Sequence, residues 1–239
     1  MEYVIKNREP ADVLRYFEEI SAIPRGSGNE KAIGEYLLDF AAKQGLEARM
    51  DDLYNVVIKK PASPGCEHLD PVILQGHTDM VCEKNKNVEH DFTKDGIKLV
   101  VDGDILRADG TTLGADDGKG VAYMLALMDS DSDTFPHPPL EFLFTTGEEV
   151  GFWGAMALDC SDITARRLDA GPEGVVATTS AGAQEVIFSI HTEYEPAKGD
   201  VLAVSVCGLL GGHSAMNITD EKGNSNKIMG RLLHNAAKV

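Results

Sequence analysis

The chain has 239 residues and a net charge of −17, from 39 acidic and 22 basic side chains. This excess of negative charge argues against a nucleic-acid partner and against an anionic membrane surface, because both require basic patches. No apolar run is long enough to span a membrane, and the N-terminus lacks the apolar segment of a signal peptide. The four cysteines are widely spaced, so we expect reduced thiols and a cytoplasmic protein.

Helical and strand patterns alternate through most of the chain. Residues 10–22 and 28–45 carry apolar side chains at helical spacing, the first beginning with a proline and the second ending with a glycine. Strands are predicted over 46–50, 55–60, 71–76, 140–146 and 164–170, with 140–146 as the central one. A hairpin over 97–109 turns at Asp102-Gly103, and 117–129 is predicted to be a buried helix. The alternation predicts an α/β sandwich around a mixed, mainly parallel sheet.

The pattern changes near residues 180–183. Residues 184–194 and 200–208 alternate strictly between apolar and polar side chains, which is typical of half-exposed antiparallel strands. Residues 225–239 have the spacing of an amphipathic helix. We therefore predict two domains, residues 1–181 and 182–239, the second being of the α+β type.

Acidic residues and a histidine follow the predicted strands. His77 and Asp79 are two residues apart and would share a face in extended chain, where a carboxylate can orient a metal-bound imidazole. Further acids occur at the ends of three other predicted strands or loops: Asp116-Asp117, Glu148-Glu149 and Asp169. Each alone also fits a solvated loop or a helix cap. Because ligands of open α/β sheets gather at the carboxyl ends of strands, the whole set indicates a cation site.

Four stretches, in the order GHTDMV, GADDGKG, TTGEEVGFWGA and LDAGPEG, resemble the co-catalytic zinc peptidase family. This family includes carboxypeptidase G, peptidase T and the aminoacyl-histidine dipeptidases. The stretches LQGHTDMVCEKN, HDFTKDGI, DGTTLGADDG and GLLGGHSAMNI are most similar to the last group, the Xaa-His dipeptidases or peptidase D. The resemblance implies a catalytic α/β domain and the first part of an inserted lid domain, through which full-length members form homodimers.

The resemblance also implies a role for each candidate residue. Two divalent metal ions are expected as cofactors, with Zn²⁺ favoured and Co²⁺ or Mn²⁺ as alternatives. Four residues match metal ligands: His77 and Asp169 on one ion, Glu149 on the other, and Asp116, which bridges both through a cis peptide bond to Asp117. Three match catalytic groups: Asp79, which orients His77; Glu148, the general base; and His213, a lid residue that holds the substrate carbonyl or the oxyanion.

The residue types fit this chemistry without the resemblance. Two divalent metals ~3.5–4 Å apart can deprotonate a water molecule and polarise a scissile carbonyl. A glutamate that binds no metal can move the water's proton to the leaving amine. Neighbours at a strand end point apart, so Glu149 can face a metal while Glu148 faces the water.

The implied substrates are short unblocked peptides, such as Xaa-His dipeptides. A tripeptidase or an N-acyl amino-acid deacylase of the same family is an alternative, and so is a truncated, non-catalytic fragment. The chain ends inside the implied lid, before the histidine that completes the second zinc site in the family. We therefore expect these 239 residues alone to bind at most one zinc tightly and to be inactive.

The remaining histidines lie outside the matched stretches. His68, His90, His137 and His191 occur in polar or proline-rich segments and are predicted to be surface residues. His234, in the last helix, is predicted to be exposed or to serve in packing.

Overall fold

The computed structural model describes residues 3–164, 166–167, 189, 191–194, 196, 199, 202–212, 217 and 219–238. The chain consists of two units, Met1–Gly182 and Ala183–Val239. Their assignment as a catalytic domain and the start of a lid domain stays a prediction.

A five-stranded sheet with the order β1-β2-β6-β3-β7 forms the centre of the first unit. Its strands are β1 (Glu47–Met50), β2 (Val56–Lys60), β3 (Val72–His77), β6 (Leu140–Thr145) and β7 (Arg166–Arg167). The β1–β2 and β2–β6 pairs are antiparallel, whereas β6–β3 and β3–β7 are parallel. The predicted α/β fold with a mixed sheet and a central strand at 140–146 is confirmed, and the strands of this sheet form as many antiparallel as parallel pairs.

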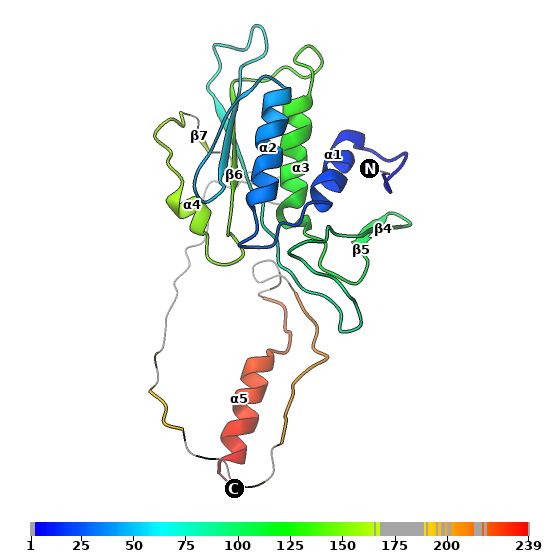
Figure 1. Ribbon diagram of the computed structural model, residues 1–239, viewed down its shortest axis with the longest axis vertical. Coiled ribbons are helices and arrows are strands. Elements are labelled where there is room, and N and C mark those ends of the chain that lie inside the picture. The colour runs from blue at the N-terminus through cyan, green and yellow to red at the C-terminus, as the bar shows by residue number, and fades with distance from the viewer. Residues whose placement is uncertain are drawn as a thin grey trace. The chain divides into compact units, whose positions relative to one another are not determined.

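Helices α2 (Lys31–Lys43) and α3 (Ala115–Asp129) cover one face of the sheet, and α1 (Ala11–Ser21) packs on α3 (Figure 1). The interface is the main apolar core, in which Leu37, Leu125 and Phe142 are completely buried. The helical spacing of the apolar side chains places them on the faces that meet this core. The three helices agree with the predicted ranges to within three residues at each end.

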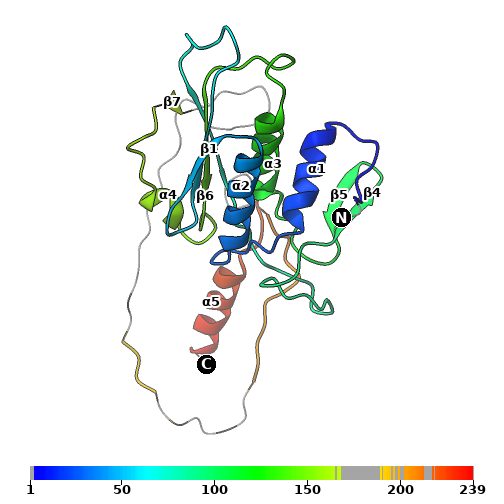
Figure 2. The same cartoon turned by 45° about the horizontal axis from the view of Figure 1, so that its top comes forward.

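The opposite face of the sheet is covered by the segment that follows the short helix α4 (Trp153–Ala157), as Figure 2 shows. Leu158 and Ile163 pack there against Val57, Ile73 and Leu143. Because successive side chains of a strand point to opposite faces, the apolar run of β2 is buried on both sides.

The predicted hairpin consists of β4 (Leu99–Asp102) and β5 (Ile105–Ala108). Asp102 pairs with Ile105, so the two-residue turn is Gly103-Asp104, one residue later than predicted. Gly103 has a φ of 58°, in the left-handed region that suits glycine.

In the second unit, residues 225–236 form the predicted helix, α5 (Ser225–Ala236). The side chain of Asn224 caps it by accepting a hydrogen bond from the Lys227 N–H at 2.9 Å. The prediction of a strand at 200–208 is wrong for residues 202–208, which have no strand structure. A strand needs a hydrogen-bonded neighbour, and most of its predicted partner, 184–194, lies outside the described residues. None of the described helices is long and apolar enough to cross a membrane.

Lys60, at the end of β2, is a buried cation that binds the end of α3. Its side chain is 8% exposed, and its ammonium group donates to the carbonyl oxygens of Leu127 (2.9 Å), Met128 (3.1 Å) and Ser130 (2.9 Å). The last carbonyls of a helix have no partner within the helix and carry partial negative charge. Lys60 therefore fastens the C-terminal end of α3 to the sheet.

We expect Lys60→Met to lower the free energy of unfolding by ~1–3 kcal/mol, because buried carbonyl groups lose their donor. Urea unfolding at neutral pH measures this change. Lys31→Met, which removes an exposed lysine on α2, is the control and should change stability by less than ~0.5 kcal/mol. Equal effects of the two substitutions would show that water replaces the Lys60 ammonium without loss.

Candidate metal centre

His77, the last residue of β3, presents its two ring nitrogens to different groups. Nδ1 lies 3.4 Å from Asp79 Oδ1 and 3.1 Å from the Asp79 carbonyl oxygen. Nε2 lies 3.2 Å from Asp116 Oδ1 and 3.9 Å from Glu148 Oε2. The ring is thus held on its Nδ1 side, and its Nε2 side faces carboxylates from two other segments.

Asp116 reaches His77 from the start of α3, where the backbone is irregular. Asp116 and Asp117 have non-helical angles, and the peptide bond between them is cis, as the family resemblance implied. The Asp116 side chain is 57% exposed. Asp117 turns back towards its own helix and accepts a hydrogen bond from the Gly120 N–H at 3.2 Å. Burial raises the pKa of Asp117.

Glu148 and Glu149 lie in a turn after β6 rather than at the end of an extended strand. The expectation that the two side chains point apart is therefore wrong, because it assumed extended backbone. Potential ligand atoms of His77, Glu148 and Glu149 all lie within 4.8 Å of one another. Burial, and then the charge of Glu148, raises the pKa of Glu149. Both carboxylates thus belong to one cluster, whose like charges favour a cation.

Asp79 connects His77 to this glutamate pair and is 0% exposed. Its carboxylate accepts hydrogen bonds from Ser27 Oγ (2.8 Å) and from the backbone N–H groups of Glu148 (3.0 Å) and Glu149 (3.2 Å). Burial alone would raise the pKa of Asp79, but these bonds and the bond to His77 lower it to about 2. Burial alone would lower the pKa of His77, but Asp79 and Glu148 raise it to about 9. The carboxylates around His77 therefore favour positive charge at this place, as a bound cation would supply.

Two other buried polar side chains hold the backbone just before the glutamate pair. Asn55 Oδ1 accepts from the Thr146 N–H at 3.0 Å, and Glu30 Oε1 accepts from the Gly147 N–H at 3.1 Å. Together with the two bonds to Asp79, four consecutive amides, 146–149, are bound by side chains from three distant segments. We call residues 146–149 the glutamate turn.

Sequence reasoning missed Asn55 and Glu30, as well as Arg25, another buried side chain beside the site. Arg25 and Glu30 belong to the stretch IPRGSGNE between α1 and α2, whose composition is typical of an exposed loop. No periodicity marks such residues as buried. The short spacing of glycines around Arg25 is the one signal that could have pointed to close packing there.

Two predicted site residues, Asp169 and His213, lie outside the described residues. The surface prediction for the other histidines is confirmed for His68 and His191 and wrong for His137. His137 is buried just before β6, where the chain packs against a neighbouring loop. Its backbone N–H donates to Ser63 Oγ at 2.9 Å.

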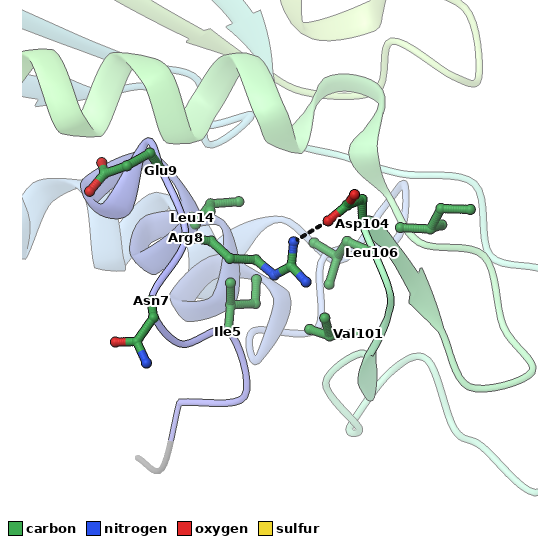
Figure 3. Close-up of a pocket in the computed structure, with 9 residues that line it drawn as sticks. Ile5, Asn7, Arg8, Glu9, Leu14, Val101, Asp104 and Leu106 are labelled. Carbon is green, nitrogen blue, oxygen red and sulfur yellow. Dashed lines mark hydrogen bonds and ion pairs between the residues drawn. The ribbon is translucent and has the colours of Figure 1, made fainter.

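A separate cavity lies between the N-terminal segment, α1 and the β4–β5 hairpin (Figure 3). An ion pair joins Arg8 Nη1 to Asp104 Oδ1 at 2.9 Å beside it. None of the candidate site residues lines this cavity, so it is distinct from the carboxylate cluster.

No protein-family model matches the chain. The chain is 38% identical over 229 residues to the cytosol non-specific dipeptidase of Escherichia coli, an alignment that covers 94% of this chain and 47% of that protein. The structure is similar to that of aminoacylhistidine dipeptidase from Vibrio alginolyticus, with a TM-score of 0.66 and 33% identity over 94% of this chain and 46% of the other. The chain belongs to the peptidase family of these two dipeptidases.

A third relative extends the same similarity. The aminopeptidase PepT from Bacillus cereus has a TM-score of 0.56 and 28% identity over 67% of this chain and 43% of the other. The family resemblance inferred from the motifs is confirmed. The chain spans about half the length of these relatives, whose matched shares are 47%, 46% and 43%.

Proposed function

We propose that the chain carries the metal-binding and proton-transfer groups of a metal-dependent peptidase acting on short unblocked peptides. The observation that supports this most is the arrangement around His77, whose Nε2 faces the carboxylates of Asp116 and Glu148 while Asp79 holds Nδ1. The printed names of the relatives describe a dipeptidase, an aminoacylhistidine dipeptidase and an aminopeptidase. The arrangement around His77 and the names of the relatives thus point to the same reaction, the hydrolysis of a peptide bond.

The donor set fits a divalent metal such as Zn²⁺, for which imidazole nitrogen and carboxylate oxygen are the usual ligands besides cysteine. In this proposal His77, Asp116, Glu149 and Asp169 would hold two ions, and Asp116 would be a ligand of both. Co²⁺ or Mn²⁺ could take the same places. Bound metal would polarise the scissile carbonyl and make water more acidic.

The protein groups then move the proton. Glu148 takes it from the attacking water, whose oxygen forms the new bond to the carbonyl carbon. The same proton passes to the amide nitrogen as the carbon–nitrogen bond breaks, so the products are a carboxylic acid and an amine, and the acid then gives its remaining proton to the amine or to solvent. Asp79 keeps the His77 ring oriented through Nδ1, and it holds the backbone of Glu148 at the same time. His213 is proposed to hold the substrate carbonyl.

Xaa-His dipeptides are the proposed substrates, with tripeptides and N-acyl amino acids as alternatives within the family. We further propose a cytoplasmic protein that forms a homodimer through residues 182–239 and has no nucleic-acid or membrane partner. The E. coli relative is described as a cytosol enzyme, which supports the first of these points.

We expect Zn²⁺ to stabilise the protein. At a free concentration ~100 times the Kd, binding to the folded state adds ~2.7 kcal/mol to the free energy of unfolding. Urea unfolding with Zn²⁺ or with a chelator measures the difference. His77→Ala should abolish it, whereas His68→Ala, which removes an exposed histidine, should retain it. Equal stabilisation of both variants would place the metal elsewhere in the protein.

A further inference from the structure

We propose that Arg25 is a positioning residue of the metal centre, because its guanidinium fastens the segment after His77 to the segment before Asp116. The inference rests on the proposed function, since it concerns how the ligands of that centre are held. Arg25 lies in the loop between α1 and α2 and itself belongs to neither ligand segment.

The hydrogen bonds of Arg25 join these two segments. Nη1 donates to the carbonyl oxygens of Thr78 (2.9 Å) and Asp79 (3.4 Å), the two residues that follow His77. Nη2 donates to the carbonyl oxygen of Gly114 at 2.6 Å, two residues before Asp116. His77 and Asp116 therefore meet across a bridge made by one planar side chain.

The surrounding chain leaves room for this guanidinium, which is 2% exposed. A Cβ atom at Gly114 would lie 2.7 Å from Nη2, and one at Gly118 would lie 2.6 Å from it. Gly114 also has a φ of 68°, which favours glycine. Two glycines at the start of α3 thus give Arg25 access to the backbone.

The bonding pattern indicates a geometric role. Across the described part of the chain, every side-chain hydrogen bond of Arg25 goes to a backbone carbonyl. A buried positive charge close to a cation site would by itself weaken metal binding by repulsion. If Arg25 nevertheless supports metal binding, it does so by holding the ligands in place. Loss of the positive charge would strengthen metal binding, whereas loss of the support for the ligands would weaken it. An affinity measurement therefore separates the two effects.

The experiment is an optical titration of the metal-free protein with Co²⁺, which reports both affinity and ligand geometry. We expect Arg25→Met and Arg25→Lys each to weaken Co²⁺ binding by ~10–100-fold and to alter the spectrum, as loss of a group that orients ligands does. Methionine makes none of the bonds, and the compact ammonium of lysine cannot fork to both segments. Tighter binding by Arg25→Met with unchanged binding by Arg25→Lys would show that only charge matters and overturn the proposal.

Lys60→Met is the matched control, because Lys60 is also a buried cation bound to three backbone carbonyls. It should lose stability in urea yet keep the Co²⁺ affinity and spectrum of the wild type. If Arg25→Met behaves in the same way, its role is structural and the proposal is wrong. Absence of Co²⁺ binding by the wild type would instead overturn the proposed function, and this inference with it.

Gly118→Ala tests the bridge without removing the arginine, which matters if Arg25→Met folds poorly. The added methyl group crowds Nη2 and should displace the guanidinium. We expect weaker Co²⁺ binding than in the wild type, and no further weakening when the change is added to Arg25→Met. Additive losses in the double variant would show that the methyl group acts independently of Arg25.

Discussion

Glu148→Gln is expected to lower kcat for dipeptide hydrolysis by ~10²–10⁴-fold while the metal content stays unchanged. Glutamine has nearly the same shape but cannot accept the proton of the attacking water. The Glu148 side chain is 34% exposed, so water and substrate can reach it. Its backbone N–H is bound by Asp79, and the substitution should therefore leave the glutamate turn in place. The measurement is kcat, with metal content by elemental analysis, on a preparation whose unsubstituted form hydrolyses dipeptides.

Glu149→Gln is the matched control, because its backbone N–H is bound by the same carboxylate at 3.2 Å. Because Glu149 is a proposed ligand, the Glu149→Gln protein should lose metal, and its activity should fall in parallel. Since both side chains lie in one cluster with His77, their roles could be exchanged. Loss of metal from Glu148→Gln and retention by Glu149→Gln would demonstrate that exchange.

In a preparation that binds two metal ions, Asp116→Ala is expected to remove both, because the proposal makes Asp116 a ligand of each. Its exposed side chain adds little packing, so the metal-free protein should unfold at nearly the wild-type urea concentration. Asp79→Asn should weaken metal binding by only ~10–100-fold, as expected of a group that orients a ligand. It should also destabilise the protein, because two backbone N–H groups and Ser27 lose a charged acceptor.

Metal content after exhaustive dialysis and urea unfolding of the metal-free variants distinguish the two residues. Asp104→Ala, which removes an exposed carboxylate in the β4–β5 turn, should match the wild type in metal content. Two metal ions retained by Asp116→Ala would refute the bridging assignment. A larger loss of metal from Asp79→Asn than from Asp116→Ala would indicate that Asp79 itself binds the ion.

The sequence predicted those elements whose apolar pattern reports their burial. All residues of β6 are buried, and its mostly apolar sequence correctly marked it as the central strand. His77 and the acids at positions 116, 148 and 149 were proposed as site residues because they lie in motifs that resemble those of the family, and the structure places them in one cluster. In each of these cases a local pattern was sufficient.

Contacts between distant loops could not be predicted in this way. Arg25, Glu30 and Asn55 are buried because each satisfies backbone groups far away in the sequence, and no spacing in their own segments records those partners. The wrong expectation for Glu148 and Glu149 has a similar origin, since strand geometry was extended into a turn. At 202–208 the alternation describes only which side chains a sheet would bury, whereas a strand forms only with a neighbour.

The way in which the glutamate turn is held has a consequence for redesign. Its four amides are bound by Asn55, Glu30 and Asp79, so side chains from outside the turn hold the backbone of Glu148 and Glu149. Histidine or cysteine could replace either glutamate on an unchanged frame, which makes metal preference and proton transfer separately adjustable. Conversely, harmful natural variants of such a protein should occur at positions 30 and 55 as well, where no ligand is altered and only the frame is lost.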